Sequence, residues 1–187
     1  ADALRFTLLS MASPGRDVKL SEDRVKGYRN FLNKIWNANN FLIQNDCKFE
    51  NIETPNNLKL NINKWIFVEF TNTNEKIKKS IDSYRFDEAA RIVYQFVWHS
   101  FCDWYLELSK TVFYSEINEN IEETRNVASF IFTQILVILH PFIPFLTEEI
   151  WLKNKLDKNG KDFLMLKNWS EASSNKDKDF DEVNEII

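Results

Sequence analysis

The sequence predicts an all-α protein, an antiparallel helical bundle with a small irregular C-terminal extension. Apolar residues recur at steps of three and four along several long segments, which is the spacing of one face of an α-helix. The 187 residues include only 3 Gly and 4 Pro, but 16 Phe and 6 Trp. Few turn-forming residues and many large apolar side chains favour long packed helices over a many-stranded sheet.

The N-terminal part of the chain contains two predicted helices. The first covers residues 2–11 and ends at a Pro-Gly break, after which an extended stretch leads to Ser21. This serine is placed to cap a second helix that runs to about residue 44. The predicted core stripe of the second helix consists of Val25, Tyr28, Leu32, Ile35, Trp36, Asn39 and Leu42. Residues 45–60 are polar and predict a surface loop.

Further helices are predicted at residues 63–83, 87–112, 121–139 and 147–156. The first of these has a weak middle at 71–74, where a kink is expected. The second is apolar on several sides, including Trp104 and Leu108, and is expected to lie centrally. Residues 162–169 are expected to be extended, and 180–187 begin another helical pattern. The predicted organisation is a leading helix and linker, a helical-bundle domain and a C-terminal extension, at residues 1–20, 21–156 and 157–187.

Charge and cysteine content narrow the functional classes. The formal net charge is −4, yet residues 1–44 carry seven Lys or Arg against four Asp or Glu. A polyanion would approach this first part of the chain, unless the asymmetry is ordinary surface scatter. Two cysteines form no disulfide framework and indicate a reducing, cytoplasmic setting. No membrane span or signal peptide is predicted, and the start at Ala1 within a helical pattern suggests part of a larger protein.

The second helix has an unusual outward face, which we call the asparagine-rich face. It is made up of Lys26, Asn30, Asn33, Lys34, Asn37 and Phe41, which fall within about 60° of one line on a helical wheel. Cations for phosphate, amides for base edges and one aromatic ring for stacking fit unpaired RNA. The alternative is that Phe41 packs under the loop at 45–60 and that the asparagines reflect a biased composition.

Other candidate chemistry is sparse. His99 and Cys102 have a spacing that would suit two zinc ligands, but no second pair accompanies them, so core packing is favoured. His140 is expected to act at a helix end. Asp103 and Glu107 share a helix face without a nucleophile or a glycine-rich loop. The charged residues near 85–91 are expected to serve the start of a helix, and no catalytic constellation or metal site is predicted.

Three stretches are distinctive in combination: residues 1–6 followed by 15–24 and 28–38, residues 84–90 running on to 101–107, and residues 139–151. In their order and spacing they resemble the valyl-tRNA synthetase family of class I aminoacyl-tRNA synthetases. They include Tyr-Arg-Asn-Phe-Leu-Asn-Lys-Ile-Trp-Asn-Ala, Phe-Cys-Asp-Trp-Tyr-Leu-Glu and His-Pro-Phe-Ile-Pro-Phe-Leu-Thr-Glu-Glu-Ile-Trp. The resemblance implies an anticodon-binding helical domain that positions tRNA(Val) for a catalytic domain absent from this chain. It implies no cofactor in this chain, ATP with magnesium in the catalytic domain, and a monomer that binds no membrane.

The resemblance also implies which residues contact the anticodon loop. Family contacts come from positions that match Lys34 and Phe41, in agreement with the helical wheel. Asn40 stands where relatives often carry arginine, which puts a contact there in doubt. The full predicted RNA-binding set is Arg16, Lys19, Arg24, Lys26, Asn30, Asn33, Lys34, Asn37 and Phe41. A helical scaffold that binds no RNA and a metal-dependent bundle enzyme remain the alternatives.

Overall fold

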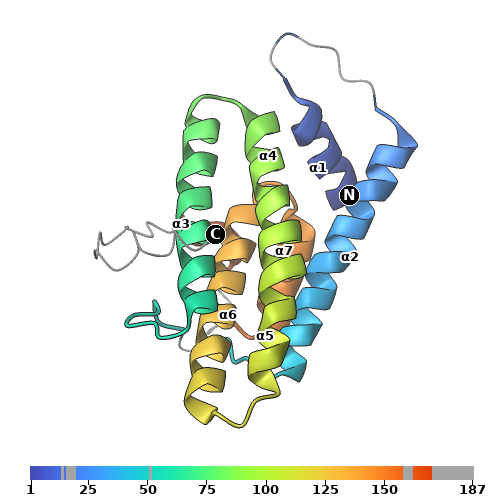
Figure 1. Cartoon of the computed structure of the whole chain (residues 1–187). Helices are drawn as coiled ribbons and strands as arrows, with labels where there is room; N and C mark the ends of the chain where they lie inside the picture. The colour runs from blue at the N-terminus through green and yellow to red at the C-terminus, as the bar shows by residue number, and fades with distance from the viewer. Residues whose placement is uncertain (14, 16–19, 51, 158–161, 170–187) are drawn as a thin grey trace.

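The computed structural model describes residues 1–13, 15, 20–50, 52–157 and 162–169, and all regular structure in them is helical (Figure 1). The elements are α1 (Asp2–Met11), α2 (Glu22–Gln44), α3 (Asn61–Asp82), α4 (Phe86–Gln95), η1 (Phe96–Tyr105), α5 (Leu106–Phe113), α6 (Asn118–Leu139), α7 (Pro144–Lys153) and η2 (Leu164–Leu166). The long helices run alongside one another with alternating direction, and the short α1 lies beside the first turns of α2. The predicted all-α bundle is confirmed.

The helix α6 forms the centre of the core. Phe132, Ile131 and Ile135 on this helix are almost completely buried, and α6 packs against α2, α3, α5 and α7. Its apolar residues occupy most sides of the helix, so it has to be covered by neighbours. The continuous rod formed by α4, η1 and α5, which the sequence analysis places centrally, instead keeps one side open to solvent.

The middle of that rod is a π-helix, η1, rather than the regular α-helix that the sequence predicts. A π-helix closes its hydrogen bonds over five residues, as in the bond from Leu106 N to Phe101 O at the end of η1. Each turn of η1 contains more residues than the 3.6 of an α-helix. The side chains that follow therefore point in different directions from those that a regular α-helix would give them. Trp104 is consequently 63% exposed and Leu108 44% exposed. Their predicted place in the core is therefore wrong.

A buried polar cluster joins α3, η1 and α6. The Asn63 side chain donates to Glu123 Oε1 at 2.9 Å and to Thr124 Oγ1 at 3.0 Å, and it accepts from the Tyr105 hydroxyl at 2.8 Å. Glu123 also accepts hydrogen bonds from two backbone amides that precede α3. The buried side chains of this cluster thus satisfy one another, which offsets the penalty of their desolvation and helps to set the register of the three helices.

The helix α1 joins the bundle through both apolar and polar contacts. Phe6 is completely buried, with ring centroids of Phe31 and Phe142 at 5.3 and 5.9 Å. The Asp2 carboxylate accepts from the backbone amides of Phe145 and Leu146 at the start of α7. An anionic group at a helix N-terminus satisfies free amides and complements the helix dipole.

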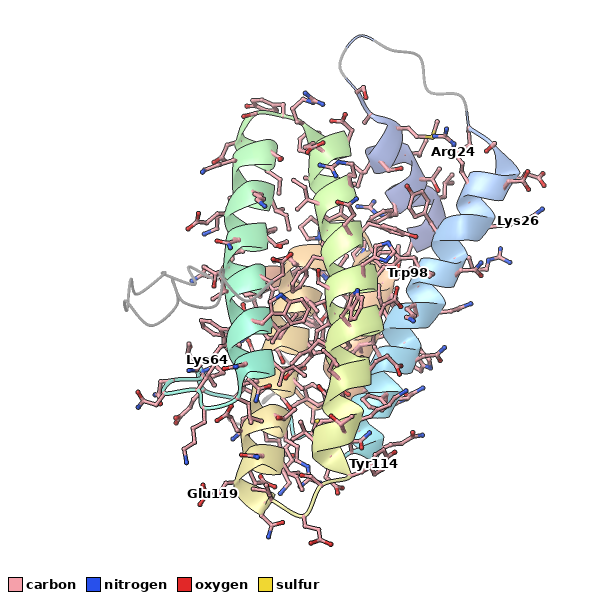
Figure 2. The ribbon with its side chains drawn as sticks, in the orientation of Figure 1. Arg24, Lys26, Lys64, Trp98, Tyr114 and Glu119 are labelled. Atoms are coloured by element: carbon pink, nitrogen blue, oxygen red, sulfur yellow. The ribbon has the colours of Figure 1, made fainter. Side chains whose placement is uncertain are left out.

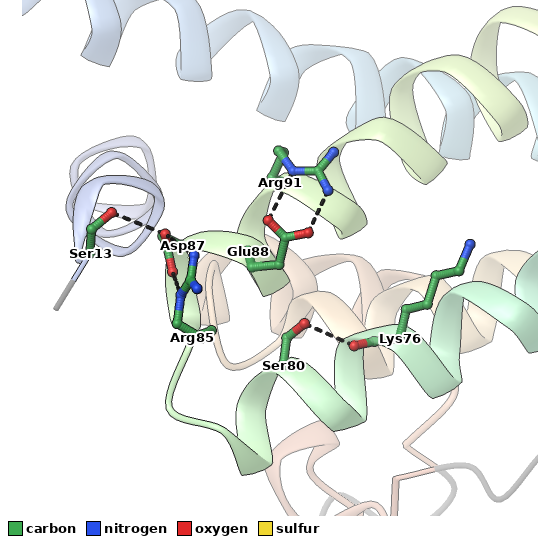
Figure 3. Close-up of polar contacts among 7 residues, drawn as sticks. All are labelled: Ser13, Lys76, Ser80, Arg85, Asp87, Glu88 and Arg91. Carbon is green, nitrogen blue, oxygen red and sulfur yellow. Dashed lines mark hydrogen bonds and ion pairs between the residues drawn. The ribbon is translucent and has the colours of Figure 1, made fainter.

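Charged residues hold the start of α4 (Figure 3). Asp87 accepts hydrogen bonds from the Arg85 guanidinium at 3.1 Å and from Ser13 Oγ, beyond α1, at 3.0 Å. These bonds lower the pKa of Asp87 to about 2, with Arg85 as the largest cause. Glu88 pairs with Arg91 one turn later. The expectation that the charges near 85–91 serve the start of a helix is confirmed.

Two segments, one between α2 and α3 and one within α3, differ from the structure that their composition predicts. The segment between α2 and α3 was expected to be a surface loop, but it buries Cys47 and Phe49, whose ring centroid lies 6.0 Å from that of Phe132. The helix α3 passes through residues 71–74 without a break, so the expected kink is absent. Here Thr71 Oγ1 donates to the backbone carbonyl of Phe67 at 3.0 Å, within the helix.

The segment at 162–169 was expected to be extended, but it forms the short 3₁₀ turn η2 with extended residues on either side. Leu164 is buried against the bundle. The indole nitrogen of Trp169 donates to Asn74 Oδ1 on α3 at 2.6 Å, and that of Trp151 donates to the carbonyl of Asp162 at 2.9 Å. This segment therefore packs back onto the helices. The helical pattern at 180–187 lies outside the described residues.

Candidate nucleic-acid interface

The asparagine-rich face lies on the solvent side of α2. Ser21 accepts a hydrogen bond from the Arg24 amide and caps the helix as predicted. The three asparagines of the asparagine-rich face, Asn30, Asn33 and Asn37, are exposed and lie in the regular part of the helix. Side chains held on a rigid helix present their donors and acceptors at fixed spacing, which is suited to reading unpaired bases.

The predicted cations differ in how free their charges are. Lys26 lies 3.9 Å from Glu22 and 3.7 Å from Asp23, so acidic residues of the first turn partly neutralise it. Arg24 is exposed and makes no ion pair within the described part of the chain. Figure 2 shows Arg24 and Lys26 at the N-terminal end of α2. The predicted cations Arg16 and Lys19 lie outside the described residues.

Lys34 is held by residues of η1. Its ammonium donates to Asp103 Oδ1 at 2.8 Å and lies 5.7 Å from the ring centroid of Trp98. The second carboxylate oxygen of Asp103 is 3.2 Å from His99 Nδ1. The hydrogen bond to Asp103 raises the pKa of Lys34, so the lysine remains charged. Sequence reasoning placed Lys34 in the interface but assigned no partner to it.

Phe41 is half-buried at the other end of the face. Its ring centroid is 6.2 Å from that of Phe113, and the Lys110 ammonium lies 5.7 Å from the Phe41 ring centroid. Lys110 is itself paired with Glu107 at 2.8 Å. The ring therefore packs on α5 rather than under the loop at 45–60, and its remaining surface is accessible to solvent. Such a ring can stack on a base with one face while the other is supported.

Two cationic residues near this face were missed by the sequence analysis. Arg29 is exposed on α2 at the edge of the asparagine-rich face, and no ion pair is recorded for it among the described residues. The position of Arg29 on the helical wheel, next to the asparagine-rich face, could have identified it from the sequence. Lys110 approaches only through the packing of α5 on α2, for which the local sequence carried no signal.

The other candidate sites do not assemble. His99 is exposed rather than packed among apolar residues, so that part of the prediction is wrong, whereas Cys102 is buried. Both thiols are unlinked, and burial raises the pKa of Cys47 and of Cys102 to about 12. No group of three or more His, Cys, Asp or Glu side chains in the described ranges is placed to hold a metal. His140 ends α6, where burial lowers its pKa and its Nδ1 lies 2.9 Å from the hydroxyl of Thr147.

Comparison with known proteins decides the family. A family model described as the anticodon-binding domain of tRNA ligase matches residues 63–187. The chain belongs to this family. The model begins within α3, so α2 and its asparagine-rich face precede the matched region of the anticodon-binding domain. In the described residues, none of the helices has both the length and the apolar character required to cross a membrane.

Curated relatives match along the whole chain, α2 included. The valine–tRNA ligase of Pelagibacter ubique is 63% identical over 187 residues, which is 100% of this chain and 21% of that protein. The valine–tRNA ligase of Agrobacterium fabrum is 43% identical, again over 100% of this chain and 20% of the relative. The chain thus spans about a fifth of the length of these relatives. The resemblance to the valyl-tRNA synthetase family is confirmed.

A solved structure shows the same fold. The crystal structure of the ternary complex of Agrobacterium radiobacter K84 agnB2 LeuRS, tRNA and LeuAMS matches with a TM-score of 0.58 at 16% identity. The match covers 82% of this chain and 18% of that one. At this identity the likeness shows a shared helical fold and nothing about individual contacts.

Proposed function

We propose that this domain binds the anticodon loop of tRNA(Val) with the asparagine-rich face of α2. The observation that carries the proposal is the row of exposed amides on α2, flanked by Lys34 and the half-buried ring of Phe41. Exposed amides hydrogen-bond unpaired base edges, and the aromatic ring offers a stacking surface. The additional cations are Arg24 and Arg29, together with Arg16 and Lys19 before the helix.

The proposal includes the role of the domain in the intact enzyme. A valine–tRNA ligase would join valine to tRNA with ATP and magnesium in a catalytic domain, and this chain would position the tRNA for that step without holding a cofactor. Residues 1–20 would lead from the catalytic domain, 21–156 would form the binding bundle, and 157–187 would extend it. We further propose a cytoplasmic monomer, consistent with the two unlinked buried thiols.

Titration of labelled tRNA(Val) with the chain tests this function. With about three to five phosphate contacts to a single-stranded loop, log affinity falls with log salt at a slope of roughly −2 to −3.5. The variant Asn37→Asp places a negative charge on the face and should weaken binding at least about tenfold at low salt, because it repels phosphate and alters the amide.

The matched control is Asn72→Asp. Asn72 is also an exposed asparagine inside a long helix, but it lies on α3, away from α2. Both variants add one negative charge, so they change the net charge of the chain equally. Equal loss of affinity in the two variants, or binding that does not respond to salt, would rule out the α2 face and favour a helical scaffold that binds no RNA there.

A further inference from the structure

A carboxylate lies beside the asparagine-rich face where only cations and amides were expected. Asp103, on the π-helix η1, points its Oδ1 to the Lys34 ammonium at 2.8 Å and its Oδ2 to His99 Nδ1 at 3.2 Å. The side chains of Lys34 and Asp103 are 37% and 36% exposed. The pair therefore reaches solvent next to the surface proposed to bind RNA.

An acidic group there opposes any simple electrostatic role for Lys34. A lysine that binds phosphate needs its positive charge free, and a neighbouring carboxylate both cancels that charge and repels the phosphate. The lysine, however, still has donor protons beyond the one directed to Asp103, and the carboxylate has about four lone-pair sites of which two are used. The pair presents a donor beside an acceptor with no net charge, which matches the edge of a base better than a phosphate.

The pair is also held in place before any ligand arrives. The Lys34 ammonium lies over Trp98, whose ring stacks on Tyr94 at 5.6 Å and on Phe31 at 6.1 Å. Phe31 is completely buried, so this aromatic stack is anchored in the core. Polar groups that are already fixed in position lose little conformational freedom on binding, and misplaced partners are penalised. Such an arrangement favours discrimination between bases.

We infer that Asp103 determines base specificity at this face, by positioning Lys34 and by accepting a hydrogen bond from the amino group of an unpaired cytosine or adenine. These bases carry an amino donor beside a ring-nitrogen acceptor, the complement of the carboxylate and the ammonium. In uracil, and in hypoxanthine, the base of inosine, a keto oxygen replaces the amino group and would face the carboxylate. This inference rests on the proposed binding of an anticodon loop, and the valine anticodon contains both an adenine and a cytosine.

The test uses stem-loop RNAs that differ at one group. The first carries a valine anticodon, the second replaces its cytosine by uracil, and the third replaces its adenine by inosine, so each change turns an amino group into a keto oxygen. Anisotropy titrations with the wild-type chain should favour the first RNA over at least one of the other two by about tenfold, a typical worth of one base-edge contact.

Asp103→Asn is the deciding variant. It should reduce that preference to less than about threefold, because an amide can donate to the keto oxygen as well as accept from the amino group. It should also steepen the salt slope by roughly 0.7, since Lys34 is released to neutralise one phosphate of a single strand. Lys34→Ala should weaken binding and leave the salt slope nearly unchanged, because the lost charge was already paired.

The matched control is Glu88→Gln on α4. Glu88 is also an ion-paired carboxylate, 37% exposed, but its partner is Arg91 on its own helix α4 rather than a lysine of α2 (Figure 3). This variant should keep both the base preference and the salt slope. Thermal melts that match the wild type would establish that each variant is folded.

Two results would overturn the inference, and they are distinguishable. If Asp103→Asn retains the base preference and the salt slope of Glu88→Gln while the chain still binds the valine stem-loop, Asp103 is only a structural counterion of Lys34. If the wild-type chain binds none of the three RNAs, the proposed function fails and the role of Asp103 fails with it. Retained preference in Asp103→Glu would support the inference, because glutamate keeps the carboxylate that accepts a hydrogen bond from the amino group.

Discussion

Substitution of Phe41 tests whether its ring stacks on an RNA base or serves mainly to pack the fold, because the two roles predict different effects on RNA affinity and on the free energy of unfolding. The ring is half-buried, with one side against Phe113 and under Lys110. A fully buried phenylalanine costs about 3–5 kcal/mol when truncated to alanine, so Phe41→Ala should lower the free energy of unfolding by about 2 kcal/mol. If the open side stacks on a base, the same variant should weaken RNA binding by about 1–3 kcal/mol.

Phe41→Leu isolates the second effect. Leucine keeps most of the apolar volume on α5 but removes the aromatic face, so its urea midpoint should stay near that of the wild type. Its affinity for tRNA(Val), measured by anisotropy, should fall nearly as far as that of Phe41→Ala. Phe70→Leu on α3 is the matched control, because this ring is completely buried against Phe96 and should affect stability without any direct effect on RNA.

The opposite pattern would refute the stacking argument. Phe41→Leu would then bind RNA as the wild type does, and Phe41→Ala would lose at least as much stability as Phe70→Ala. Such a result would place Phe41 in the core and leave the amides of α2 as the principal contacts. Unfolding would be followed by circular dichroism in urea, with binding measured at protein concentrations where every variant is fully folded.

Three further outcomes concern the fold and its titrating groups. Asn63→Ala should destabilise the chain by roughly 2–4 kcal/mol in urea unfolding, because it leaves buried partners unsatisfied; a change below about 1 kcal/mol would contradict the proposed network. The pKa of Asp87 is lowered to about 2 from 3.8, so its contribution to stability should be present above about pH 4 and lost as pH falls toward 2. Asp87→Asn should flatten that acid dependence, and an unchanged pH profile would refute the role of the ion pair with Arg85. Cys47 and Cys102, with pKa values near 12, should react with a thiol reagent at pH 8 only as fast as the chain opens, and rapid labelling of the folded chain would refute their burial.

Most of the helical architecture was predictable because its signals are local. The capping serine and the apolar periodicity of α2 each act within a few residues of their own position. The buried residues of α2 show the limit of that method. Phe31 is completely buried and was absent from the predicted stripe, whereas Val25 and Trp36 are only half-buried. The prediction of helix α2 was correct, but which neighbour covers each side of it depends on the rest of the chain.

The sequence by itself determined that the chain is helical, that its family is that of anticodon-binding domains, and that amides and cations share one face of α2. Only the tertiary structure decided which of these groups are paired with other residues of the chain. Lys34 and Asp103 are 69 positions apart, and no periodicity relates them. They meet because η1 is wound as a π-helix and packs against α2, so the charge of Lys34 is neutralised by a residue from another helix. Local spacing sets which side of a helix a residue occupies, whereas long-range packing sets what that residue touches.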